Sequence, residues 1–399
     1  MRRFAMRLLV SVFFAFVCLS AAAQSLQPPE IAARSYLLLD VTASQTLVAK
    51  EADKPVEPGA LTKLMSAYLV FDAVRSQKLD LKQTLPVSVR AAKMPGPRMF
   101  INTGMQVPVE DLIKGMVVRS GNDATMALAE AVAGTAEHFV YLMNEQAKAF
   151  GMQATTYKNA VGLVEPGHST TAHDLGILAT RLLTDFPGSV GYYALKSYRY
   201  PGTPAANDAN RNLLLLRDPT VDGLETAYTD ASGFGMVASA QRAFHNLAGA
   251  PESAEVPAAP GSRRLVAVVL GAANENARAY ESQKLLNWGF TAFEAVKLFE
   301  ANQAVVRPNV WKGSEAVVQL GRPQAIVVAV PKGSASKIST QVVRSEPLVA
   351  PFVQGQQVGV LRVSVGGQPL VDVPLLVLEA VDQAGLVRRA WDALRLWIR

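Results

Sequence analysis

The stretch EPGALTKLMSAYLV, from Glu57 to Val70, is the segment from which the rest of the chain can be interpreted. Its apolar residues recur at helical spacing: Leu61, Leu64, Met65, Tyr68 and Leu69. Lys63 therefore lies near the start of a predicted helix. A lysine one turn after a serine, written S-x-x-K, can activate that serine as a nucleophile, but here Ala60 stands one turn before Lys63. The stretch is either an active-site helix without its nucleophile or an ordinary helix.

The composition describes a globular protein of more than one core. The chain has 399 residues, of which 50% are hydrophobic and 18% are charged. The formal net charge of +6 includes Arg2, Arg3 and Arg7, and without them 36 basic residues face 33 acidic ones. This balance gives little support for a nucleic-acid partner, which needs a concentrated basic face. We therefore expect no nucleic acid among the partners.

Residues 1–23 have the three parts of a secretory signal peptide. A positive MRRFAMR precedes an apolar LLVSVFFAFVCLS, and AAA supplies small residues for cleavage. The apolar run is short for a membrane-spanning helix. Cys18 is the one cysteine of the chain and follows Val17, whereas a lipoprotein signal needs a small residue there. The mature chain should then lack cysteine, and with it any disulfide.

Residues 24–293 are predicted to form one domain in which strands flank a helical middle. Strands are predicted in 35–50, around a turn at Ala43–Ser44, and again in 222–227, 233–244 and 263–272. Helices are predicted in 107–118, 123–134, 136–151, 170–183 and 277–293, with a Pro- and Ala-rich loop at 250–262. This order indicates an α/β (α+β) domain with an antiparallel sheet against helices.

Residues 294–380 are predicted to form a small all-β domain, because short strands with Gly and Pro punctuation occupy 325–333, 337–343, 358–365 and 368–378. Residues 381–399 end in an amphipathic helix. Its apolar arc contains Leu386, Val387, Ala390, Trp391, Leu394, Trp397 and Ile398, and Arg388, Arg389, Asp392, Arg395 and Arg399 lie opposite. Tryptophan and arginine on such a helix favour attachment in the plane of a membrane interface, while docking on the protein itself is the alternative.

Three short motifs occur in order along the first domain. Ala60-Leu61-Thr62-Lys63 comes first, Ser120-Gly121-Asn122 lies between two predicted helices, and Glu225-Thr226-Ala227 lies in a predicted strand. Order, spacing and context resemble the S-x-x-K, S-x-N and K-T-G set of the penicillin-binding serine acyltransferases. The flanks, including DKPVEPGALTKLMSAYLVF and VVRSGNDATMALAE, are similar to the serine-type D-Ala-D-Ala carboxypeptidases. The resemblance runs from about Ser35 to Phe293 and implies a penicillin-binding/β-lactamase-like fold.

The resemblance also implies a role for each position. The first-motif serine attacks the D-Ala-D-Ala bond of a peptidoglycan stem peptide, Lys63 is the general base, and Ser120 relays protons. Asn122 holds the substrate amide, and a third-motif lysine and Thr226 bind the terminal carboxylate. Backbone N–H groups form an oxyanion hole. No cofactor or metal is implied.

This chain departs from that pattern at the positions that would carry out the reaction or bind its substrate. Ala60 replaces the nucleophile, Glu225 the lysine and Ala227 the glycine, and Tyr228 stands where the family usually has histidine. Removing the nucleophile of a comparable serine hydrolase costs about 10⁶ in turnover. An acid at 225 would repel a carboxylate and is expected to favour the protonated form of a nearby Lys63.

Three functions remain open. The first is an inactive binding or scaffold module on the periplasmic face of the inner membrane, in contact with peptidoglycan or an envelope-assembly protein. The second is an active D-Ala-D-Ala carboxypeptidase, and the third is a cleft retuned to a cationic ligand by Glu225. Ser66, Ser120 and the literal S-x-x-K of Ser334–Lys337 are poor substitutes for the nucleophile, and His168 and His173 lack metal-ligand spacing.

Overall fold

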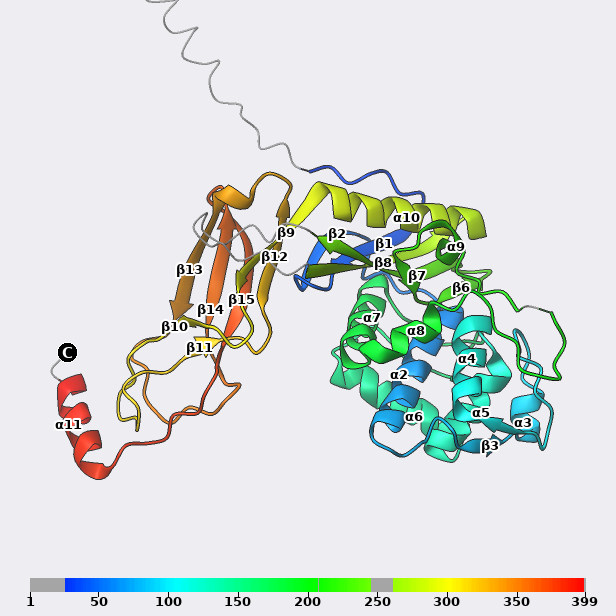
Figure 1. Ribbon diagram of the computed structural model, residues 1–399, viewed down its shortest axis with the longest axis horizontal. Coiled ribbons are helices and arrows are strands. Elements are labelled where there is room, and N and C mark those ends of the chain that lie inside the picture. The colour runs from blue at the N-terminus through cyan, green and yellow to red at the C-terminus, as the bar shows by residue number, and fades with distance from the viewer. Residues whose placement is uncertain (1–25, 207, 245–260, 398–399) are drawn as a thin grey trace, which may run out of the picture.

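The computed structural model describes residues 26–206, 208–244 and 261–397. The predicted signal peptide and residues 250–260 of the predicted loop lie outside these ranges. Figure 1 shows a larger domain of sheet and helices, a smaller domain of strands, and a helix at the C-terminal end. This arrangement confirms the predicted fold class of an α/β domain followed by an all-β domain and a terminal helix.

The central sheet of the larger domain is antiparallel. Its order is β2-β1-β8-β7-β5, and β6 also pairs with β7. The strands are β1 (Ser35–Asp40), β2 (Gln45–Lys50), β5 (Val221–Gly223), β6 (Thr226–Thr229), β7 (Gly233–Phe244) and β8 (Gly261–Ala272). Strands that are far apart in the sequence therefore meet at the centre of the sheet, where β1 lies beside β8 with Ser35 opposite Leu270.

Helices cover both faces of this sheet (Figure 1). The helices of the larger domain are η1 (Gly59–Thr62), α2 (Lys63–Arg75), α3 (Val89–Ala92), α4 (Val109–Arg119), α5 (Asn122–Ala133), α6 (Ala136–Ala149), α7 (Ala172–Asp185), η2 (Pro187–Ser189), α8 (Val190–Tyr193), α9 (Leu214–Arg217) and α10 (Glu275–Ala292). A short hairpin of β3 (Thr84–Pro86) and β4 (Gln106–Pro108) lies among them.

Alternation along the central strands divides the core into two layers. In β8, Val266 and Val268 pack with the helical region that contains α2 and α7, whereas Ala267 and Val269 pack with α10. Successive strand residues point to opposite faces, so a continuous apolar run such as LVAVVL suits a strand that is covered on both sides.

The smaller domain has its own core. It contains β9 (Phe293–Phe299), β10 (Ala304–Val306), β11 (Leu320–Gly321), β12 (Ile326–Pro331), η3 (Ala335–Lys337), β13 (Ile338–Arg344), β14 (Gln357–Val365) and β15 (Gln368–Val377). Five strands form one sheet in the order β10-β11-β15-β14-β13, and β12 pairs with β9. Gln45 of β2 joins the domains, because its side chain donates to Ala329 O and accepts from Ala329 N.

Most predicted elements are confirmed, with differences mainly at their ends. The strand predicted at 222–227 is wrong as one element, because β5 ends at Gly223 and β6 begins at Thr226. The predicted helix at 57–70 is a 3₁₀ turn followed by α2, and the helix predicted at 277–293 ends at Ala292 because β9 begins at Phe293. Residues 261–262 were expected in a loop but belong to β8. The hairpin of β3 and β4 was not predicted, because three-residue strands carry too little pattern. The terminal helix α11 (Leu386–Trp397) is confirmed.

Candidate active site

The first motif lies at the junction of η1 and α2. Ala60 is in the 3₁₀ turn, and Lys63 is the first residue of α2. The Lys63 side chain is buried, and its Nζ donates a hydrogen bond of 2.7 Å to Val161 O. The helix start therefore presents Ala60 and Lys63 as the resemblance implied, with a methyl group where a serine would carry its hydroxyl.

The loop that supplies Val161 is held in place by Asn159. Asn159 Oδ1 accepts hydrogen bonds from the backbone N–H groups of Val161, Gly162 and Leu163, at 3.3, 2.8 and 3.0 Å. Gly162 has a φ of +88°, and a Cβ there would lie 1.9 Å from Gly59 O. Only glycine allows this approach. The role of Val161 as the lysine's acceptor was not predicted, because it uses a backbone oxygen.

The second motif occupies the break between α4 and α5, as predicted. Ser120 ends α4 in the left-handed region, with a φ of +52°, which is uncommon for a residue other than glycine. Its buried Oγ makes no hydrogen bond of good geometry. Burial raises the pKa of the nearby Glu225 carboxyl, and the Ser120 hydroxyl offsets part of that rise. Asn122 begins α5, and its Nδ2 donates to Pro95 O at 2.6 Å. The second motif is thus partly bonded to its own chain.

The third motif runs into β6. Glu225 precedes the strand and is only 4% exposed, and its Oε1 accepts a 3.1 Å hydrogen bond from Thr226 N. Thr226 and Ala227 are buried as well. Tyr228 is 54% exposed, packs against Phe234 and donates from its hydroxyl to Asp230. The acid therefore points into the protein, and the tyrosine points out of it.

The three motifs meet at a cavity of about 290 Å³. The predicted site residues that line it are Ala60, Lys63, Ser120, Asn122, Thr226, Ala227 and Tyr228. Glu225 is the predicted residue that does not line it, since its carboxyl is buried behind the wall. Segments more than 150 residues apart in sequence thus form one site, with the acid below its surface.

Two arginines that were not predicted also line this cavity. Arg211 and Arg278 belong to its wall, together with Glu275. Arg278 is buried and donates from Nη1 to Ala227 O at 3.2 Å, while its Nε has no partner. Burial lowers the pKa of Arg278 to about 10, so the guanidinium stays charged at neutral pH. Single arginines belong to no motif, so their place in the cavity wall could not be predicted from the sequence.

Burial shifts both ionisable groups of the altered motifs. It lowers the pKa of Lys63, although the charges of Glu225 and Asp123 act in the opposite direction. It raises the pKa of the Glu225 carboxyl, which the charge of Lys63 partly offsets. The expectation that an acid at position 225 favours the protonated form of Lys63 is confirmed in direction, because the charge of Glu225 raises the pKa of Lys63. Desolvation has the larger effect and leaves that pKa at about 8, so the amine is still mostly protonated at neutral pH. Lys63 Nζ donates to Val161 O and makes no ion pair with Glu225, although the two charges affect each other's pKa.

The remaining serines considered as substitute nucleophiles and the two histidines do not line the cavity. Ser66 is fully buried and donates to Ala160 O at 2.6 Å. Ser334 and Lys337 lie around η3 in the smaller domain. His168 contacts Thr62, and His173 contacts Asp53. Within the ranges that the structure describes, no group of three or more His, Cys, Asp or Glu residues is placed to hold a metal ion.

A lysine at a helix start, an S-x-N turn and a threonine strand around one cavity define the class of penicillin-binding acyltransferase folds. A family model described as D-alanyl-D-alanine carboxypeptidase matches residues 22–250. A second model, described as penicillin-binding protein 5, C-terminal domain, matches residues 293–383. The chain belongs to the D-alanyl-D-alanine carboxypeptidase family.

Individual relatives cover nearly the whole chain. D-alanyl-D-alanine carboxypeptidase DacC of Escherichia coli is 35% identical over 380 residues, which are 93% of this chain and 90% of that protein. DacA of Haemophilus influenzae is 31% identical over 399 residues, which are 98% and 96% of the two chains. The crystal structure of penicillin-binding protein 5 from Haemophilus influenzae superposes with a TM-score of 0.78 at 30% identity, covering 90% of this chain and 99% of that one.

Proposed function

We propose that this protein is a catalytically inactive member of its family that binds a carboxylate-ended peptide of the cell wall and does not cleave it. The observation that carries the proposal is Ala60 in the cavity wall, at the helix start where the family's nucleophile stands. A methyl group cannot form an acyl-enzyme. Lys63 keeps the lowered pKa of a general base, but it has no hydroxyl at position 60 to deprotonate.

The charges around the cavity support a carboxylate as the bound group. Lys63, Arg211 and Arg278 line the cavity, against Glu275 as the acid of the wall. A guanidinium is well suited to bind a carboxylate through two parallel hydrogen bonds. The peptide that gives the family its name ends in a carboxylate, so a D-alanyl-D-alanine terminus fits this surface. The third hypothesis, a cationic ligand, has no support, because Glu225 lies behind the wall.

Labelling with a fluorescent penicillin tests the inactivity. The protein should give no covalent band on a denaturing gel, while Escherichia coli DacC serves as the positive control. A band from the unaltered protein would contradict the proposal and favour the second hypothesis, an active carboxypeptidase. In that case Ser120→Ala would show whether Ser120 is the attacking residue. Restoring Ala60→Ser, Glu225→Lys and Ala227→Gly together should return the band.

Calorimetric titration tests the binding. A peptide that ends in D-alanyl-D-alanine should bind to the unaltered protein, and its C-terminal amide should bind at least tenfold more weakly. Arg278→Gln should reduce this difference, because it removes one of the three positive charges that line the cavity. Equal affinity for acid and amide would show that the cavity does not recognise a carboxylate. Of the two partners proposed for an inactive scaffold module, only an envelope-assembly protein would then remain.

We also propose that the protein acts in the periplasm, attached to the surface of the inner membrane through α11. Within the described ranges, no helix has the length and apolar content needed to cross a membrane. In α11, Leu386, Val387 and Trp397 are more than 80% exposed. Truncation before Gly385 should release the protein from anionic liposomes, and unchanged binding would count against attachment by this helix.

A further inference from the structure

The segment before α11 is paired with a loop of the smaller domain, Lys312–Ser314. Ser314 N donates to Asp382 O, and Ala384 N donates to Lys312 O, each at 2.8 Å. Gly313 and Gln383 form an antiparallel bridge between these bonds. The chain therefore enters the helix along a fixed path, and not through a free linker.

The helix then returns to the same loop with its side chains. Asp392 is 9% exposed, and its Oδ2 accepts a hydrogen bond of 2.7 Å from Lys312 N. One turn earlier, Arg388 Nη1 donates to Ser314 O at 3.1 Å. One turn later, Leu396 lines a cavity with Trp311. Residues 388, 392 and 396 are spaced by four, so they lie along one face of the helix.

This docked face lies opposite the apolar one. At about 100° per residue, positions 386, 387, 390, 394 and 397 fall about 120–240° around the helix from position 392. They are Leu386, Val387, Ala390, Leu394 and Trp397, and all five are exposed. The contact with Lys312–Ser314 thus turns every one of these apolar side chains away from the body of the protein.

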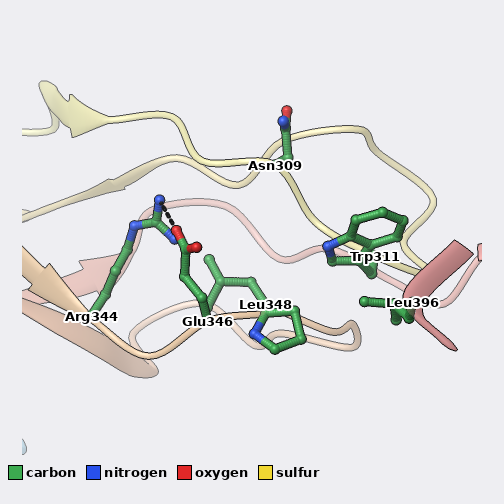
Figure 2. A pocket seen from close by; sticks show the side chains of 7 residues that line it. Asn309, Trp311, Arg344, Glu346, Leu348 and Leu396 are labelled. Carbon is green, nitrogen blue, oxygen red and sulfur yellow. Dashed lines mark ion pairs between the residues drawn. The ribbon is translucent and has the colours of Figure 1, made fainter. Parts of the chain in front are cut away.

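Polar contacts hold the helix more than apolar packing does. Beside Leu396 is a cavity of about 390 Å³, and Figure 2 shows Trp311 and Leu396 on one side of it and the Arg344–Glu346 ion pair on the other. Because the helix does not fill this space, we expect the hydrogen bonds of Asp392 and Arg388 to contribute much of the docking. A bond between a charged group and a backbone N–H shifts an equilibrium by roughly tenfold or more.

We propose that the Lys312–Ser314 loop, defined here as the docking loop, holds α11 as a fixed platform that presents its apolar face to an anionic membrane surface. The lipid part rests on the membrane attachment proposed above. Trp391 and Trp397 suit the interfacial region, and Arg389 and Arg395 flank the apolar face with charges that complement anionic headgroups. A rigid platform would hold the active-site cavity at one orientation to the membrane, which a flexible tether could not do.

Distances between two spin labels test the docking without lipid. Labels at Thr340→Cys in β13 and Ala393→Cys in α11 can be placed on a Cys18→Ser chain, because Cys18 is the only natural cysteine. We expect one narrow distance distribution, which Asp392→Ala broadens while Asp392→Asn, whose amide oxygen can still accept, broadens it less. Arg389→Gln is the matched control and should leave it narrow. A broad distribution in the unsubstituted helix would overturn the docking, and a narrow one in Asp392→Ala would overturn the part that Asp392 has in it.

Vesicles of phosphatidylglycerol and phosphatidylcholine test the platform. The distribution should stay narrow when the protein binds them, and Arg389→Gln should weaken binding several-fold. A large change in distance on binding would overturn the platform, since the helix would then leave the docking loop. Failure of the protein to bind would refute the membrane attachment and leave the docking result intact. Lipid-independent dimers that Trp397→Ser disperses would show that a second copy covers the apolar face.

Discussion

Glu225→Gln should stabilise this protein, and the gain should grow between acid and neutral pH. Burial raises the pKa of the Glu225 carboxyl from 4.5 to about 7. Between these values the native state holds a proton that the unfolded chain has released, so the free energy of unfolding falls as pH rises. At about 1.4 kcal/mol for each pKa unit, the full loss is about 3 kcal/mol. Glutamine has no such proton, and its oxygen can still accept the bond from Thr226 N.

Lys63 changes the free energy of unfolding in the next higher pH range, and with the opposite sign. Its pKa is lowered from 10.5 to about 8, so between these values the unfolded chain binds the extra proton, and stability rises with pH. The pair should therefore give the unaltered protein its lowest stability between about pH 7 and 8. Glu225→Gln should remove the acid side of this minimum and leave the alkaline side.

Differential scanning calorimetry at pH 5 and pH 7.5 measures the effect. For a domain of this size each kcal/mol changes Tm by about 2–4 °C, so the advantage of Glu225→Gln should increase by several degrees between the two values. Glu346→Gln, which removes an exposed acid of the smaller domain, controls for the loss of one negative charge. If the Glu225→Gln advantage is the same at both pH values, the buried carboxyl does not titrate as argued.

Other substitutions test the packing around the cavity. Ser66→Ala should cost about 1 kcal/mol, because it leaves Ala160 O without its donor, and urea unfolding measures this loss. Asn159→Ala removes the acceptor of three backbone N–H groups and should cost about 2 kcal/mol, together with faster hydrogen exchange in residues 159–163. Asp40→Asn leaves the buried Arg263 without its 2.6 Å ion pair and should cost about 3–5 kcal/mol. An unchanged unfolding midpoint in any of these variants would contradict the corresponding contact.

The sequence predicted the helices and strands because their patterns are local. Thr171 precedes an apolar repeat and caps α7 by accepting from Asp174 N, and Gly151 follows α6 with a φ of +75°. Both signals lie within a few residues of the elements that they delimit. The short strands β3 and β4 lack such signals, and their pairing depends on contacts across about 20 residues.

Of the residues that form the site, the sequence predicted those that belong to its motifs and no others. The motifs predicted seven of the residues that line the cavity, because a lysine, a serine or a threonine can be assigned by spacing. Arg211, Arg278 and the carbonyl of Val161 have no spacing of their own, and tertiary packing brings them in. The direction in which the Glu225 side chain points could not be predicted from the sequence either. A residue before a strand can face the cavity or the core, and here the core side offers the N–H of Thr226.

Ala60 and Ala227, two of the positions that differ from the motif pattern, cost the fold little, whereas the buried Glu225 carboxyl costs it about 3 kcal/mol at neutral pH. Ala60 needs no partner in its 3₁₀ turn, and Glu225 has one in Thr226 N. The methyl group of Ala227 lies next to Gly59, where a Cβ would come within 3.3 Å of it. Because Gly59 has no side chain, position 227 can carry an alanine. The buried Lys63 has a partner in Val161 O, which accepts a hydrogen bond from its Nζ, and this contact needs no nucleophile. The contacts that pack this cavity therefore do not depend on a hydroxyl group at position 60.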